Sequence, residues 1–339
     1  MDIFENIKKL CELNGISGRE SAVAEEIVRQ IGESADEVRI DNLGSVIAFK
    51  KGKKTPKSRV MFCAHMDEVG MIVTGISGEG MLRVDAVGGI NPKVIIGRRV
   101  TVGQAAIPGV IGNKPIHLLD DEERESAPKL DKLYLDIGAN DREEALSLGD
   151  SVHFVGDYEE FGRDMLVAKA VDDRAGCAIL LELLHSELEY DTWFCFAVQE
   201  EVGGRGARAA SYTIDPDIAV VVESTASGDV SGVEGENRVC LVGGGAVVSF
   251  MDRSTIYDKA LYDYAFEAAA KKGIPCQTKT KVAGGNDAGV IQTATGGVRC
   301  MAISIPSRYI HSASDVVKKS DVQAVLDLVK AIAEGVGEL

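Results

Sequence analysis

The stretch VQEEVGGRGA, residues 198–207, follows an apolar run (192–198) that is typical of a buried strand. It places two adjacent carboxylates, Glu200 and Glu201, at the end of this strand, and the chain then turns on glycine. Two like charges at the end of a core strand repel each other, and each resists removal from water. The pair therefore indicates either a strongly positive partner between the two side chains or a carboxylate that works as a base.

Composition restricts the class of protein. The chain has 339 residues, 45% of them hydrophobic, which suits two domains or one large domain with an insertion. Its net charge of -16 argues against nucleic-acid binding, because phosphate neutralisation needs clustered lysine and arginine. No apolar run reaches the roughly 18 residues of a membrane span, and residues 1–10 lack the apolar core of a signal peptide. The seven cysteines lack close pairing, so we expect reduced thiols in a cytoplasmic protein.

The periodicity of the chain predicts an α/β protein with an insertion. Helical and strand patterns alternate in residues 1–67 and again in residues 165–339, which indicates one discontinuous domain with a mostly parallel central sheet and helices on both faces. Residues 68–164 instead contain short β-like pieces separated by glycine, proline and charge clusters, so we expect an inserted, β-rich, barrel-like domain. Near the start, SGRE (17–20) has the pattern of a capping box that opens a helix.

Charged side chains stand at several expected strand ends, where ligands collect in open α/β sheets. Besides the pair in residues 198–207, they lie in FCAHMDEVG (62–70, with His65 and Asp67), AKAVDDRAG (168–176, with Asp172 and Asp173), VVVEST (220–225, with Glu223) and SRYIHSASD (307–315, with His311). Each alone has an ordinary explanation: a structural His–Asp hydrogen bond, a helix cap, a surface glutamate or a solvated loop histidine. Together they bring two histidines and several carboxylates to the carboxyl ends of the strands.

This ligand set predicts a metal centre. Histidine and carboxylate without cysteine suit zinc, cobalt or manganese rather than a structural zinc site. One histidine and one terminal carboxylate for each ion, with one shared carboxylate, would hold two ions about 3.5–4 Å apart and leave one carboxylate as a base. The remaining histidines, His117, His153 and His185, are expected on the surface without a role.

The order of these residues resembles the co-catalytic metallopeptidases. The wording of the motifs resembles one branch, the glutamyl aminopeptidase or tetrahedral aminopeptidase family, some members of which are labelled endoglucanase or cellulase M. The resemblance covers almost the whole chain, including SGRE, HMDEVG, VIIGRRV (94–100), GVIGNKP (109–115), AVDDRAG, QEEVGGRGA, GGNDAG (284–289) and RYIHS.

The resemblance implies a role for each residue of the predicted site. It implies that His65 binds one metal, that His311 binds the other and that Asp67 orients His65. Asp172 would bridge the two metals, and the peptide bond between Asp172 and Asp173 would be cis. The terminal carboxylate ligands would be Glu201 and Glu223, and the general base would be Glu200. Neighbours on a strand point in opposite directions, so spacing alone does not decide between Glu200 and Glu201.

Two departures and one insertion accompany this likeness. Many relatives carry aspartate where this chain has Glu223, and threonine is frequent where it has Asn286, so a substrate contact near Asp287 could differ. The β-rich insertion resembles the family's PDZ-like dimerisation domain, which implies a homo-oligomer built from dimers, up to a dodecamer.

We therefore predict a metal-dependent aminopeptidase that hydrolyses the N-terminal residue from peptides, using water activated by two metal ions and a glutamate base. A rival hypothesis is a glycoside hydrolase with Glu200 and Glu223 as its carboxylates. It leaves His65, His311 and Asp172 unexplained, and one tryptophan with 5% aromatic residues is little for a sugar-binding cleft. The same residues would also suit a non-peptide amidohydrolase or deacylase of the same metal clan, or an oligomeric scaffold with a structural metal.

Overall fold

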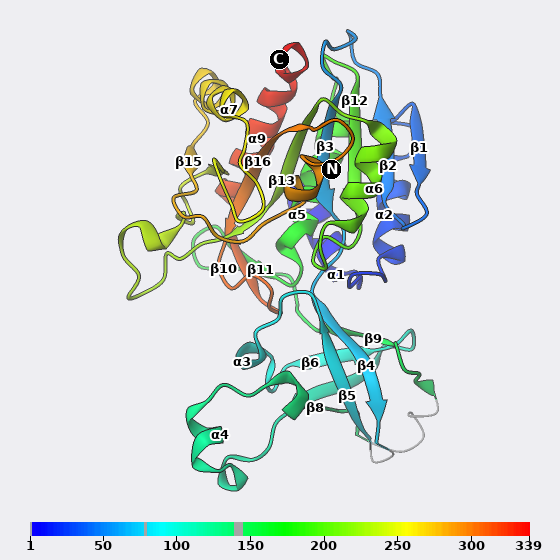
Figure 1. Cartoon of the computed structure of the whole chain (residues 1–339), viewed down its shortest axis with the longest axis vertical. Helices are drawn as coiled ribbons and strands as arrows, with labels where there is room; N and C mark the ends of the chain where they lie inside the picture. Colours follow the sequence, from blue (N-terminus) through cyan, green and yellow to red (C-terminus); the bar gives the residue numbers. More distant parts are fainter. Residues whose placement is uncertain (1, 78–79, 139–144) are drawn as a thin grey trace.

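The computed structural model describes residues 2–77, 80–138 and 145–339 (Figure 1). Its central layer is an eight-stranded sheet. The strands follow the order β1 (Glu37–Ile40), β2 (Val46–Lys50), β12 (Thr192–Ala197), β3 (Val60–His65), β13 (Ile218–Ala226), β16 (Arg299–Ser307), β14 (Ala246–Val248) and β15 (Cys276–Thr278). The neighbouring strands β12, β3, β13 and β16 are all parallel, and they therefore end at the same edge of the sheet.

Helices cover both faces of this sheet, as the alternating sequence pattern predicts. One face carries α1 (Ile3–Glu12), α2 (Ser21–Ile31), α5 (Val171–His185), α7 (Lys259–Lys272) and α9 (Lys319–Ala333). The opposite face carries α6 (Arg205–Ile214) and α8 (Ala288–Ile291). The residues of β3 are all buried because both faces are covered, which explains the continuous apolar run of this strand.

The predicted capping box at residues 17–20 is wrong. Helix α2 begins at Ser21, its N-cap Glu20 makes no capping hydrogen bond through its side chain, and Ser17 lies outside the helix. The Ser17 hydroxyl instead donates to Asp67 Oδ2 at 2.6 Å. The Ser17 side chain therefore bonds to a residue 50 positions away rather than capping the adjacent helix.

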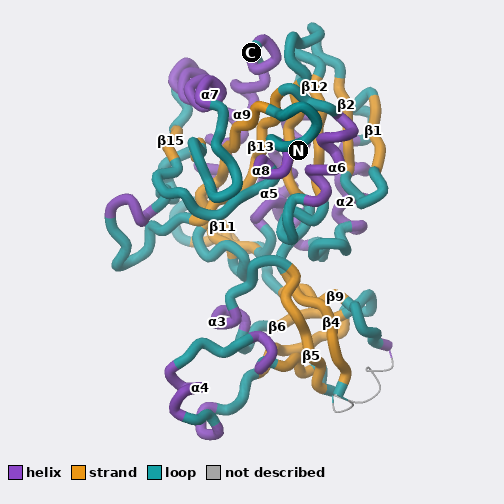
Figure 2. Tube along the Cα trace, in the orientation of Figure 1, coloured by secondary structure: helices purple, strands orange, loops and turns teal. Residues whose placement is uncertain are grey.

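The β-rich insertion forms a closed barrel with its own core (Figures 1 and 2). Its strands follow the order β4 (Gly70–Ile76), β5 (Met81–Val87), β8 (Tyr134–Asp136), β7 (Ile107–Gly112), β6 (Arg99–Val102) and β9 (Ser151–Phe154). The short helices α3 (Pro92–Ile95) and α4 (Asp121–Glu125) and the 3-10 turns η1 (Ile116–Leu118) and η2 (Leu130–Lys132) flank it. In Figure 1 the barrel lies below the large sheet, with α4 on an excursion to one side.

A small antiparallel sheet lies where the chain returns from the barrel. It consists of β10 (Glu159–Phe161), β11 (Met165–Ala168) and β17 (Asp315–Lys318). The 3-10 turns η4 (Gly235–Arg238) and η5 (Val336–Glu338) follow β13 and α9 in the chain. These observations confirm the predicted fold class, an α/β sheet covered on both faces plus an inserted barrel, while the domain limits at residues 67 and 165 stay a prediction. Among the described helices, none is long and apolar enough to cross a membrane.

Candidate metal centre

The carboxyl ends of the parallel strands and the start of α5 surround one cavity of about 380 Å³. All but one of the predicted metal ligands and catalytic residues line it: His65 from β3, Asp172 from α5, Glu200 and Glu201 after β12, Glu223 from β13 and His311 after β16. The exception is Asp67, which is fully buried behind the cavity wall. The edge of the sheet therefore gathers residues that are far apart in the sequence.

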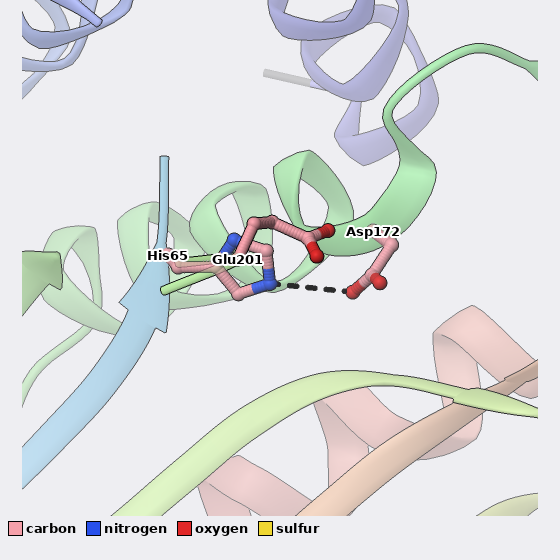
Figure 3. A group of neighbouring side chains, drawn as sticks. All are labelled: His65, Asp172 and Glu201. Atoms are coloured by element: carbon pink, nitrogen blue, oxygen red, sulfur yellow. Dashed lines mark ion pairs between the residues drawn. The ribbon is translucent and has the colours of Figure 1, made fainter. Parts of the chain in front are cut away.

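Asp172 lies between the two histidines. Its Oδ1 is 3.4 Å from His65 Nε2, and its Oδ2 is 3.5 Å from His311 Nε2 (Figure 3 shows the first of these pairs). Both separations are long for hydrogen bonds. Two ligand atoms that bind the same tetrahedral zinc at about 2.1 Å lie roughly 3.4 Å apart. One oxygen for each histidine is the arrangement expected of a carboxylate that bridges two cations.

Glu201 completes the group. Its Oε2 is 3.4 Å from His311 Nε2, and ligand atoms of His65, Asp172 and Glu201 lie within 4.8 Å of one another. Figure 3 shows the three side chains converging from different elements. Glu223 lines the same cavity, but its carboxylate is outside this group. The donor set of imidazole and carboxylate fits divalent zinc, cobalt or manganese.

The second aspartate of the Asp172–Asp173 pair has a structural role. The peptide bond between the two residues is cis, as the resemblance implies. Asp173 is fully buried, and its Oδ2 accepts a hydrogen bond from the backbone N–H of His65 at 3.2 Å. Its Oδ1 accepts one from Gly176 at 3.0 Å. Asp173 therefore ties the end of β3 to the start of α5, which holds the segments carrying His65 and Asp172 together.

Asp67 has a second set of partners besides His65. Its carboxylate is 3.5 Å from His65 Nδ1, while the same nitrogen lies 3.2 Å from the Asp67 backbone carbonyl. Its Oδ1 accepts a hydrogen bond from the backbone N–H of Glu200 at 2.9 Å, and its Oδ2 accepts one from that of Glu201 at 3.1 Å. Asp67 thus lies beside the imidazole and holds the turn that carries both glutamates.

The electrostatics of the cavity favour positive charge. Burial opposes charge on His311, but Asp172 and Glu201 outweigh it and raise the pKa of His311 to about 9. Burial raises the pKa of Glu201 to about 7. Burial also opposes ionisation of Asp172, yet the two imidazoles, His311 and His65, hold its pKa below its ordinary value. The cluster thus draws protons onto its ligands, and bound cations would displace such protons.

Glu200 differs from its neighbour. It lines the cavity, and within residues 2–77, 80–138 and 145–339 no side chain or backbone group forms a hydrogen bond or ion pair with its carboxylate. Burial raises the pKa of Glu200 well above its ordinary value, and the charges of Asp287 and Glu201 add to this effect against the attraction of His65. A free carboxyl group with a raised pKa suits proton transfer.

Several contacts in and beside the cavity were not predicted from the sequence. Lys279 lines the cavity, and the Nδ2 of Asn286 donates to Glu223 Oε1 at 2.7 Å. His153, expected on the surface, is buried, with Nε2 2.9 Å from Ser151 Oγ and Nδ1 4.0 Å from Glu68. The imidazole lies close enough to Glu68, Lys169 and Arg174 for their charges to act on it. No local pattern signals these contacts.

Comparison with known protein families gives one extensive match. The model of the M42 glutamyl aminopeptidase family matches residues 44–328. A protein of Acetivibrio thermocellus is 40% identical over 98% of each chain. The lysyl aminopeptidase of Pyrococcus furiosus is 34% identical over 98% of this chain and 96% of its own. The glutamyl aminopeptidase of Lactococcus lactis is 30% identical with the same coverage.

Solved structures share the whole fold. The TET aminopeptidase of Thaumarchaeota archaeon SCGC AB-539-E09 superposes with a TM-score of 0.94 at 33% identity, covering 99% of this chain and 97% of that chain. The TET1 peptidase of Pyrococcus horikoshii, which can assemble into a tetrahedron or a large octahedral shell, gives 0.86 at 33% identity over 98% and 100%. A Thermotoga maritima structure named endoglucanase gives 0.80 at 32% identity over 98% and 97%.

Proposed function

This chain belongs to the M42 glutamyl aminopeptidase family and is a metal-dependent aminopeptidase, and we propose that Glu200 is its general base. The observation that carries this assignment is the free carboxylate of Glu200 beside the cluster of His65, Asp172 and Glu201. A base must be close to the reacting water and must not be held by another protein group. Glu201, whose carboxylate faces His311, does not meet the second condition.

We assign two divalent cations to the cavity, with zinc or cobalt preferred and manganese as a third candidate. His65 and His311 would each hold one, Asp172 would contribute one oxygen to each, and Glu201 and Glu223 would be the terminal ligands. When bound, such cations polarise the scissile carbonyl and acidify water. Glu200 takes the proton from the attacking water and gives it to the departing amine. The carboxylates around the cavity favour a free α-amino group, so cleavage is exopeptidic.

We further propose that the preferred N-terminal residue is acidic. Lys279 lines the cavity and is 6% exposed, and the described residues provide no hydrogen-bond or ion-pair partner for its ammonium group. A buried cation without such a partner is costly. The charge of Glu223, whose pKa Lys279 lowers, offsets part of that cost, and bound metal ions nearby would increase it. The carboxylate of an N-terminal glutamate or aspartate would neutralise it, whereas a lysyl side chain would be repelled. Of the two named specificities among the relatives, Lys279 favours the glutamyl one.

A homo-oligomer in the cytoplasm completes the proposal. The TET1 peptidase of P. horikoshii assembles into closed shells, and its fold matches this chain over 98% of its length. We therefore expect dimers built through the barrel, and a dodecamer as the assembled form. All seven cysteines are free, which suits a reducing compartment.

Two single-carboxylate variants test the assignment of the base. Glu200→Gln should retain the metal content and the circular dichroism spectrum, while kcat for an aminoacyl chromogenic substrate falls by about 10²- to 10⁴-fold. Glu201→Gln makes the same chemical change one residue away and should lose metal together with activity. Unchanged turnover of Glu200→Gln would contradict the base assignment.

Metal removal separates the aminopeptidase from the rival hypotheses. Chelation should abolish hydrolysis of the aminoacyl substrate, and zinc, cobalt or manganese added one at a time should restore it. A chelator-resistant activity on a β-glucan would favour the glycoside hydrolase instead. Activity on N-acyl amides but not on peptides would favour the amidohydrolase of the same metal clan.

A further inference from the structure

A buried chain of hydrogen bonds leads from an anchored loop to Glu223. Asn286 Nδ2 donates to Glu223 Oε1 at 2.7 Å and to the Tyr257 hydroxyl oxygen at 2.9 Å. The Tyr257 hydroxyl donates to Asp252 Oδ2 at 2.6 Å. All four residues are less than 9% exposed. These bonds therefore connect the metal cavity with the loop that begins at Asp252.

The direction of every bond in this chain is determined. Asp252 Oδ2 accepts from the Tyr257 hydroxyl, and the hydroxyl oxygen is left to accept from Asn286. The Asn286 Oδ1 accepts the backbone N–H of Ala288 at 2.8 Å, which identifies the opposite atom as the amide nitrogen. Both hydrogens of that nitrogen are then used, one toward Tyr257 and one toward Glu223.

The anchored end is held rigidly by backbone groups. Asp252 Oδ1 accepts hydrogen bonds from the backbone N–H groups of Ser254 and Thr255, each at 2.7 Å, and from the Ser254 hydroxyl at 2.9 Å. Asp252 is 1% exposed, so these bonds do not compete with solvent. The amide of Asn286 is thereby fixed from both sides before it meets Glu223.

The two carboxylate oxygens of Glu223 differ in their hydrogen-bond partners. Oε1 accepts from Asn286 and, at 3.3 Å, from the Ser304 hydroxyl. Within residues 2–77, 80–138 and 145–339, Oε2 has no hydrogen-bond donor, and the residue lines the cavity. A carboxylate fastened by one oxygen keeps the second available, and it loses little further side-chain freedom when it binds a cation.

We propose that Asn286 is a positioning residue that fastens Glu223 through Oε1 and so presents Oε2 to a cation in the cavity. This inference rests on the proposed function, in which Glu223 is a terminal ligand. Asn286 acts through Glu223 and touches neither substrate nor cation. Replacing Asn286 therefore lowers the affinity for the cation that Glu223 binds. The affinity for the cation held by Glu201 and His311 stays unchanged.

Calorimetric titration of the metal-free protein with Co²⁺ or Zn²⁺ tests this inference without using activity. Asn286→Leu keeps the size of the side chain and removes its donors, and it should weaken one of the two binding steps by about 10- to 100-fold. Asn6→Leu is the matched control, because Asn6 is also buried (2% exposed) and accepts a hydrogen bond from Gln30, but on α1. That control should leave both steps unchanged.

Further variants keep the test decisive if Asn286→Leu folds poorly. Tyr257→Phe removes one partner of Asn286 but leaves the bond to Glu223, so it should weaken the same step by a smaller factor. In a Glu223→Ala background, replacing Asn286 should produce no additional loss, since coupled residues are not additive. Parent-like affinity in both Asn286→Leu and Tyr257→Phe, or fully additive losses, would overturn the inference. A parent protein that binds no divalent cation would instead overturn the proposed function.

Discussion

Replacing Lys169 by methionine should destabilise the protein far more than the same replacement in an exposed ion pair. Lys169 Nζ donates to both carboxylate oxygens of Glu68, at 2.8 and 2.9 Å, and to the Leu13 carbonyl at 2.8 Å. Both side chains of the ion pair are only 4% exposed. Arg174 Nη2 lies 3.7 Å from Glu68 Oε1 and is the nearest remaining positive charge.

The expected cost follows from this burial. Removing one partner of a buried ion pair costs about 3–5 kcal/mol, because the remaining charge stays in the interior without compensation. Arg174 remains to offset part of the Glu68 charge, so we expect about 3 kcal/mol, at the lower end of the range. The matched control is Lys272→Met, which removes a pair with Glu334 of almost equal length, 2.8 Å, whose side chains are 51% and 60% exposed. Such an exposed pair contributes about 0–1 kcal/mol.

The assay is equilibrium urea denaturation of the metal-free proteins, followed through the fluorescence of Trp193, the single tryptophan, in β12. The Lys169→Met midpoint should fall by an amount worth about 2 kcal/mol or more beyond that of Lys272→Met, with similar slopes. The ion pair also lies next to the proposed metal site in the chain, because Glu68 follows Asp67 and Lys169 precedes Asp172 by three residues. The metal affinity of Lys169→Met should therefore fall as well. Equal shifts for the two variants would refute the reasoning.

Two more predictions concern pH and specificity. Burial lowers the pKa of His153 from its ordinary 6.5 to about 4. The imidazole is therefore protonated below pH 6.5 in the unfolded chain, but only below about pH 4 in the folded protein. The stability that depends on neutral His153 should be fully present above pH 6.5, and the free energy of unfolding should decline by about 3 kcal/mol as the pH falls to 4. The urea midpoints of His153→Gln should lack this decline. Parallel pH profiles of the parent protein and the variant would contradict the prediction. Lys279→Met should reduce kcat/KM for a glutamyl substrate by about 10- to 100-fold and spare a leucyl substrate. The exposed Lys281→Met is its control, and an equal loss on both substrates would argue against charge recognition.

The location of the candidate site could be predicted from the sequence because the direction of the strands determines which residues meet. Parallel strands end at a common edge, so a histidine at the end of β3 and another after β16 must approach each other although 246 positions separate them. Apolar runs identify these strands without any knowledge of their partners. The closed barrel could be expected on similar grounds, from short strands separated by turn residues.

The supporting contacts could not be predicted, because they join side chains through tertiary packing. Glu68 meets Lys169 across 101 positions, and Glu223 meets Asn286 across 63. The Ser17 hydroxyl has a local use as a helix cap, which the sequence favours, and a distant one at Asp67, which the fold selects. Packing decides between such competing partners, and no local pattern records the decision.

The two adjacent glutamates show how far such a decision reaches. On a strand, Glu200 and Glu201 would point to opposite faces, and only one could reach the cavity. Here β12 ends at Ala197, and Gln199 has a positive φ of 59°, so the pair lies in a turn and both side chains line the cavity. Asp67 holds this turn by accepting both backbone N–H groups, while its carboxylate stays 3.5 Å from His65. One carboxylate therefore sets the positions of the proposed base and of two proposed ligands, and Asp67→Asn should disturb metal binding and proton transfer together rather than either alone.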